Sequence, residues 1–210
     1  ILKTGLGTDT ILAFNATTPA AAGNIIGSGT QTNTISGSLN VDPAMANGSF
    51  DINLSTGSLI VNISDGMGGV APFSPLAFNV VRFDDVIGTQ NDDSIIGNTN
   101  ANVFTASAGD DFYDGLVDGD NDTITYEGLG ESITLLDTGD ILKGGSLGTD
   151  SIDNIETIIA DSTATNNTID GEDNAGVSFT VDLAAESLTV NIASGPVVNS
   201  TIVNFDDVFG

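Results

Sequence analysis

The sequence contains no cysteine, no histidine and no tryptophan, and only three of its 210 residues are basic. Without cysteine no disulfide can stabilise the fold, and without cysteine or histidine a zinc site lacks its usual ligands. The absence of histidine also removes the base of a serine-type catalytic triad. Paired carboxylates for glycoside hydrolysis stay open on spacing alone. A sugar cleft usually offers aromatic platforms, however, and this chain has two tyrosines. We therefore expect a protein that is not an enzyme.

Acidic side chains dominate the charge, because 29 Asp and Glu residues stand against three Lys and Arg residues and the net charge is −26. Such a surface repels nucleic acid and anionic lipid, so we expect cations as partners and neither of those. An acidic chain can be disordered, but an apolar content of 40% indicates a folded core. We expect no membrane span, because no apolar run is long enough for one, and no signal peptide.

Residues 88–125 repeat with a period of nine, as GTQNDDSII, GNTNANVFT, ASAGDDFYD and, after a two-residue insertion, VDGDNDTIT. The sixth position is polar in every repeat: Asp93, Asn102, Asp111 and Asp122. The eighth position is apolar in every repeat: Ile95, Phe104, Tyr113 and Ile124. A polar half that turns a corner and a short strand with one inward apolar residue describe one coil of a β-roll.

Acidic residues at the sixth position would stack at the spacing of adjacent strands, where like charges repel. Ca²⁺ takes several oxygen ligands from carboxylates and turn carbonyls, so it is the natural neutraliser of such a column. We therefore expect Ca²⁺ to bind within residues 85–127. The candidate ligands are Asp85, Asp93, Asn102, Asp111, Asp118, Asp120 and Asp122. The alternative interpretation is that Asp and Asn only fill turns, because both hydrogen-bond their own backbone there.

The nonapeptide stretch resembles the hemolysin-type (RTX) calcium-binding repeat, G-G-x-G-x-D-x-U-x, in which U is apolar. Asp fills the sixth position in three of the four repeats, and an apolar residue fills the eighth in all of them. The glycines are depleted, since only Gly88 and Gly97 stand at the first position and only Gly109 at the fourth. The resemblance implies a parallel β-roll with incomplete calcium occupancy, and it is close over about a fifth of the chain.

A longer repeat runs through the whole chain. Four segments recur in the same order: 1–11 as 141–152, 33–37 as 167–171, 50–63 as 179–192, and 80–88 as 202–210. The chain thus holds roughly one and a half copies of a unit of about 120–140 residues, which is typical of a tandem array. We expect it to be a fragment or mature piece of something longer.

Outside residues 88–125, several segments alternate apolar and polar residues at period two, and no stretch has a helical period. The pattern predicts an all-β protein, a β-solenoid or parallel β-roll built from tandem repeats. Its flanking strands either extend the solenoid or form small antiparallel segments. We expect an end of a first unit at 1–49, a β linker at 50–87, an RTX-like roll at 88–127, second-repeat coils at 128–178 and a second linker at 179–210.

These features favour a non-catalytic structural module of an extracellular bacterial surface protein, such as a surface layer, fibril or adhesin. The module would be secreted or cell-surface, bind calcium to fold and assemble, and contact neighbouring repeats or further copies of itself. One alternative is an RTX-like accessory or secretion module of a secreted enzyme whose catalytic domain lies elsewhere. Another is a carbohydrate- or ice-binding face, suggested by alternating Thr30, Thr32 and Thr34. Asn-x-Ser/Thr sequons leave glycan attachment open.

Overall fold

The computed structural model describes residues 2–3, 23–27, 32–37, 48–62, 75–117, 119–171, 176–192 and 197–210. Within these ranges the protein is all-β, and its one helical segment there is a short 3₁₀ turn, Gly144–Ser146. The predicted all-β class is therefore confirmed. This part of the chain contains no helix with the length and apolar character needed to cross a membrane.

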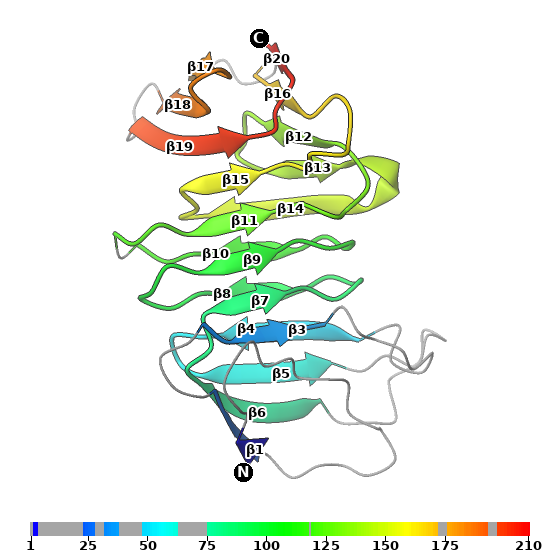
Figure 1. The fold of residues 1–210 in the computed structure, drawn as a ribbon, viewed down its shortest axis with the longest axis vertical. Helices are drawn as coiled ribbons and strands as arrows, with labels where there is room; N and C mark the ends of the chain where they lie inside the picture. Colours follow the sequence, from blue (N-terminus) through cyan, green and yellow to red (C-terminus); the bar gives the residue numbers. More distant parts are fainter. Residues whose placement is uncertain are drawn as a thin grey trace.

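The strands form two mostly parallel sheets that run along the long axis of the molecule, with the two termini at opposite ends (Figure 1). In spatial order, the twelve-stranded sheet contains β1 (Leu2–Lys3), β2 (Gly23–Ile26), β6 (Leu76–Val81), β5 (Ser58–Asn62), β4 (Ser49–Asn53), β8 (Ser94–Ile96), β10 (Phe112–Asp114), β14 (Gly148–Asp153), β13 (Ile141–Lys143), β12 (Ile133–Leu136), β16 (Thr168–Asp170) and β20 (Asp207–Phe209). The eight-stranded sheet contains β17 (Val177–Asp182), β18 (Ser187–Ile192), β19 (Val197–Val203), β15 (Thr157–Ile159), β11 (Thr123–Thr125), β9 (Val103–Thr105), β7 (Asp85–Ile87) and β3 (Thr34–Ser36).

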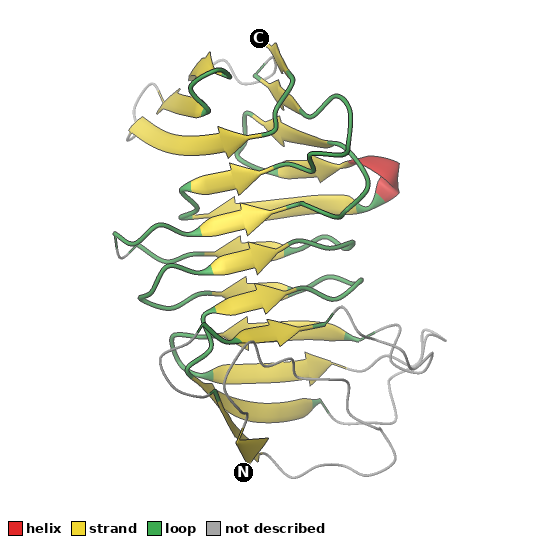
Figure 2. Ribbon diagram, in the orientation of Figure 1, coloured by secondary structure: helices red, strands yellow, loops and turns green. Residues whose placement is uncertain are grey.

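The middle of the molecule is a stack of three-residue strands joined by polar loops (Figure 2). Successive strands from β7 to β11 alternate between the two sheets, and each pairs in parallel with the next strand of its own sheet. Each nonapeptide supplies one strand, and its eighth residue is the buried centre of that strand: Ile95, Phe104, Tyr113 and Ile124. The strand positions predicted from the nine-residue period are therefore confirmed.

In-register pairing places equivalent side chains above one another and so builds the core. In the eight-stranded sheet one buried column contains Ile35, Val86, Phe104, Ile124, Ile158 and Ile202, none more than 3% exposed. The twelve-stranded sheet contributes Ile52, Ile95 and Tyr113, all fully buried. The rings of Phe104 and Tyr113 join the two columns, with their centroids 5.8 Å apart. Burying each such side chain contributes roughly 1.5–3 kcal/mol.

Three groups of strands depart from parallel pairing. Strands β4–β5–β6, β12–β13–β14 and β17–β18–β19 each pair antiparallel internally. Each group nevertheless joins its neighbours in parallel, as β4 joins β8, β14 joins β10 and β19 joins β15. The flanks of the nonapeptide stack therefore contain antiparallel segments inserted into a parallel stack, which combines the two arrangements that the sequence left open.

From β4 to β7 the first copy of the long repeat pairs its strands in the same register as the second copy does from β17 to β20, but in the opposite sheets. Strands β1 and β13, from the repeated segments 1–11 and 141–152, are an exception: both belong to the twelve-stranded sheet, and β1 pairs in parallel with β2 whereas β13 pairs antiparallel with β12 and β14. Strands β4 to β7 of the first copy correspond to β17 to β20 of the second. Phe50 faces Val61 across the first hairpin as Phe179 faces Val190 across the second. Strand β6 pairs with β2 as β19 pairs with β15, and β7 pairs with β3 as β20 pairs with β16. The first hairpin belongs to the twelve-stranded sheet and the second to the eight-stranded sheet.

Candidate functional site: two columns of buried polar side chains

The sixth position of each nonapeptide lies immediately before its strand and is buried. Because successive strands alternate between sheets, these residues form two columns. The Asp93 column contains Asp93, Asp111 and Asp150, each at most 3% exposed. The Asn102 column contains Asn102 and Asp122, both fully buried, and Glu156, which is half-buried. The sixth residue thus recurs at an equivalent place in every coil, but the residues form two columns instead of the single column that the sequence suggested, and each column gains a member from beyond the nonapeptides.

Carboxylates of the Asp93 column accept main-chain hydrogen bonds from the strand layer before them. The amide of Phe50 donates to Asp93 Oδ1 at 2.6 Å, and the amide of Asp93 donates to Asp111 Oδ1 at 2.9 Å. The amide of Asp111 in turn donates to Asp150 Oδ1 at 3.2 Å. Asp93 also accepts from the amide of Thr89 at 2.6 Å. Buried amides must find acceptors, so each carboxylate ties two layers of the stack together.

The Asn102 column repeats this bonding in the other sheet. The amide of Asn102 donates to Asp122 Oδ1 at 2.7 Å, and the amide of Asp122 donates to Glu156 Oε2 at 2.8 Å. The side-chain amide of Asn102 donates to the carbonyl of Asp84 at 2.7 Å, a bond that a carboxylate could not make. This column therefore keeps the layer-to-layer bonds while placing a neutral side chain at one position.

Two of the four nonapeptides begin with glycine, and the contacts at this first position explain why. A Cβ at Gly97 would collide with Asn102 Oδ1, which accepts the amide of Asn98 at 2.8 Å. Ala106 stands at the same position before Asp111, whose Oδ2 is turned instead towards a lysine and a tyrosine. The glycine is thus needed where the sixth side chain folds back onto its own loop.

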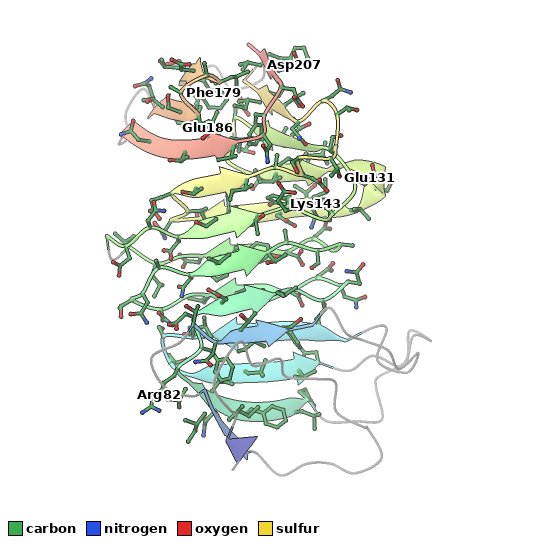
Figure 3. All side chains as sticks on the ribbon, viewed as in Figure 1. Arg82, Glu131, Lys143, Phe179, Glu186 and Asp207 are labelled. Atoms are coloured by element: carbon green, nitrogen blue, oxygen red, sulfur yellow. The ribbon has the colours of Figure 1, made fainter. Side chains whose placement is uncertain are left out.

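Lys143 is the internal cation of the Asp93 column. Its side chain, on β13, is fully buried inside the stack (Figure 3). The ammonium group donates to Asp111 Oδ2 at 3.1 Å, to Asp150 Oδ1 and to the carbonyl oxygen of Ser107 at 2.7 Å. These three acceptors use the full donor capacity of an ammonium group. The chain itself therefore supplies the positive charge that we expected from a metal ion at this level.

Two tyrosines complete the polar cluster around Lys143. The hydroxyl of Tyr126 donates to Asp150 Oδ2 at 3.0 Å, and that of Tyr113 donates to Asp111 Oδ2 at 3.3 Å. Burial, reinforced by the nearby carboxylates, raises the pKa of both hydroxyls well above their ordinary value. Both tyrosines therefore stay protonated and act as donors in a network whose members satisfy one another.

Burial makes the carboxyl groups of this column weak acids. It raises the pKa of Asp93 to about 7 against the opposing effect of the amides that donate to it. It raises the pKa of Asp150 to about 7 as well, although Lys143 favours the ionised form. The pKa of Asp111 is also raised by burial. Removing water from a carboxylate disfavours its charged form, so the column retains protons at a pH where exposed carboxylates have lost them.

The remaining predicted ligands lie apart from these columns. Asp85 is half-buried in β7 and accepts the amide of Val103 at 3.1 Å, while burial raises its pKa. Asp120 is exposed in the loop between β10 and β11, and Asp118 lies outside the described residues. In the part of the chain that the structure describes, no three acidic side chains are arranged to hold a metal ion.

The donor set of the Asp93 column does not fit a calcium ion. All six carboxylate oxygens of Asp93, Asp111 and Asp150 accept hydrogen bonds from amides, hydroxyls or the Lys143 ammonium group. A calcium ion would have to displace these donors and share the site with a buried positive charge. At these positions hydrogen bonds and Lys143 take the neutralising role that the sequence suggested for calcium.

Sequence reasoning missed Asp150 and Glu156 as members of the two columns. Both lie outside the nonapeptides, so their position could not be read from a nine-residue period. A signal was present in the long repeat, where Lys3 and Asp9 recur as Lys143 and Asp150. Joint recurrence of a rare lysine and an aspartate indicates a structural pair.

The chain matches no family model, and no curated protein matches it either. The interpretation of the site therefore depends on the geometry of the two columns and on the repeat pattern.

Proposed function

We propose that this chain is a non-catalytic structural repeat module, a β-solenoid of parallel β-roll type, of an extracellular bacterial surface protein such as a surface layer, fibril or adhesin. The observation that carries the proposal is the strand register that β4 to β7 of the first copy share with β17 to β20 of the second. A scaffold that grows by stacking needs each unit to present the same pairing edges to its neighbours.

The alternation of short strands between two sheets supports the solenoid assignment. A chain that visits the two sheets in turn, with one strand per nine residues, winds once for every two strands. The in-register apolar columns give such a winding a continuous core, in which each layer contacts only its neighbours.

The inward direction of the polar network supports a structural rather than a catalytic role. Lys143 and the carboxyl groups of the Asp93 column bond to one another, to two tyrosine hydroxyls and to main-chain groups of adjacent layers. A fully satisfied buried network rigidifies a fold and fixes its register.

We further propose that calcium, as in the RTX-like repeats that the sequence resembles, acts at the acidic loop before β11 and not in the Asp93 column. This loop carries Asp120 and leads into Asp122, and its other predicted ligand is Asp118. Binding there would stabilise the folded stack by mass action and would offset repulsion in a chain of net charge −26.

The test is a calcium titration from a chelated start, followed by far-UV circular dichroism and light scattering. A gain in β signal that is abolished by Asp122→Asn, together with increased scattering, supports a calcium-dependent module that assembles. Asp93→Asn is the matched control, since it removes a charge from the column that lacks a calcium-like donor set. A β spectrum unchanged by calcium would remove the ion from the proposal, and failure to associate at any calcium concentration would remove assembly.

A further inference from the structure

The C-terminal end of the stack presents two strand edges that have no second neighbour among the described strands. Strand β17 is the last strand at one end of the eight-stranded sheet, and β20 is the last strand of the twelve-stranded sheet. Both lie at the same end of the molecule, where Phe179 and Asp207 mark them in Figure 3. Each edge therefore offers main-chain groups for a further parallel strand.

The first copy of the repeat contains the partners that these edges lack. Strand β4, the counterpart of β17, pairs with β8 so that Ile52 faces Ile95. Strand β7, the counterpart of β20, pairs with β9 so that Val86 faces Phe104. Strands β8 and β9 come from the first two nonapeptides, which follow β7 directly in the chain. Every other pairing of β4 to β7 recurs in the second copy. Only the pairings of β4 with β8 and of β7 with β9 have no counterpart among the described strands of the second copy.

Side-chain exposure differs between the copies in the same way. Val86 is fully buried in the first copy, whereas its counterpart Val208 is 41% exposed and the adjacent Phe209 is 51% exposed. Between the two edges lies a groove of about 420 Å³ lined by Val177, Ser178, Phe179, Val181, Val208, Phe209 and two glycines. In the first copy the buried side chains of Ile95 and Phe104 pack over the corresponding strands.

We propose that this C-terminal face is a docking surface for the first two strands of a further repeat unit, of the kind that residues 88–105 form. The first strand would pair in parallel with β17 and place its central apolar residue opposite Val181. The second would pair with β20 and place a large apolar residue opposite Val208. The inference deepens the proposed structural role by naming the segment that one unit recognises in the next.

Polar groups specify the occupant further. In the first copy the amide of Phe50 donates to the carboxylate of Asp93, and the amide of Val103 donates to Asp85 at 3.1 Å. The counterparts on the docking surface are the amide of Phe179 and the carboxylate of Asp207. The incoming segment must therefore bring an Asp immediately before its first strand and a free amide at the start of its second. An arbitrary apolar strand lacks this pattern.

The experiment extends the full 210-residue chain with a copy of residues 89–127 joined directly after Gly210, which reproduces the chain order that follows Gly88. Hydrogen exchange is measured at the amides of β17 and β20, in chelator and in calcium. Docking should slow exchange at both strands by at least about tenfold relative to the unextended chain, because the new pairing must open before exchange occurs.

The matched control carries the same extension with its copies of Ile95 and Phe104 replaced by Asp. A second pair of variants compares Val208→Asp with and without the intact extension. The substitution should leave exchange in the unextended chain nearly unchanged, and it should abolish the protection that the extension provides. Equal exchange with the intact extension and with its Asp-substituted control would overturn the inference. That result would leave the calcium and assembly tests of the proposed function unaffected, since those use the unextended chain.

Discussion

The Asp93 and Asn102 columns meet one structural demand with two distributions of charge. Their nonapeptide members stand immediately before three-residue strands, and both columns accept the amide of the layer before them at 2.7–3.2 Å. The Asp93 column uses three carboxyl groups and encloses Lys143 among them. The Asn102 column includes a neutral amide and ends at half-buried Glu156. The shared requirement is an oxygen acceptor at each layer, and charge is a secondary property that each column compensates differently.

The difference shows why a repeated Asp need not indicate a metal. A side-chain oxygen recurs because a buried amide recurs, and Asn supplies that oxygen as well as Asp does. Where several carboxyl groups stack, compensation comes from a cation or from proton uptake. The predictions below test which of these operates in each column.

Replacing Lys143 with Met should have the largest effect. The substitution keeps the volume of the side chain but leaves Asp111 and Asp150 buried without their cation. We expect a loss of about 3–5 kcal/mol in the free energy of unfolding at pH 8, measured by urea denaturation. Combining Lys143→Met with Asp111→Asn and Asp150→Asn should restore part of this loss, because the uncompensated charges are then removed. A loss below about 1 kcal/mol in the single variant would mean that Lys143 does not balance the column.

The stability of the fold should fall as the pH rises from about 4 to about 7. Burial raises the pKa of Asp93 and Asp150 from 3.8 to about 7, so the folded state holds more protons than the unfolded state in this window. Stability that is fully present below pH 3.8 is therefore lost as the pH rises through about 7. The slope should approach about 1.4 kcal/mol per pH unit for each group.

Urea denaturation across this pH range measures the slope directly. Asp93→Asn should make the slope shallower, since one titrating group of the Asp93 column is then removed while Asp111 and Asp150 remain. The Asn102 column supplies the contrast, because Asn102→Ala removes no titrating group and should leave the slope intact. Stability that rises from pH 4 to pH 7 would contradict the assignment of proton uptake to the Asp93 column.

Replacing Gly97 with Ala should cost about 1–3 kcal/mol, because the new Cβ would displace Asn102 from its bond with the amide of Asn98. Thermal unfolding of the variant would show the loss. Gly210→Ala is the matched control, since a Cβ there meets no atom within 4 Å. Equal melting temperatures for the two variants would remove the steric explanation for glycine at the first nonapeptide position.

Replacing Asn102 with Asp should have the smallest effect, a loss of about 1 kcal/mol at neutral pH. The carboxylate keeps the shape of the amide but can no longer donate to the carbonyl of Asp84. It also adds a charge next to Asp122. Paired urea denaturation of the variant and the parent chain resolves a difference of this size, and a stabilised variant would show that the column prefers charge to a neutral amide.

Much of the central stack could be predicted from the sequence because its information is local. A period of nine sets the strand positions, so the burial of Ile95 and the recurrence of Asp93 at an equivalent position of each coil followed from counting residues. The partners of Asp111 could not be found in this way. Lys143 lies 32 residues away on an antiparallel strand, and no local pattern specifies which layer that strand reaches. Antiparallel flanking segments were one of two alternatives that the sequence left open, since period-two alternation describes both pairing directions.

The placement of the two copies in opposite sheets has a geometric consequence. From the first copy to the second, the chain advances along the stack, and the strands equivalent to β4 to β7 move to the opposite sheet as β17 to β20. Any longer stack with these registers would have the symmetry of a twofold screw, in which a given surface loop returns to the same side only after two units. A ligand or glycan carried once per unit would then alternate between opposite sides, and the structural repeat of such a stack would span two units of the sequence.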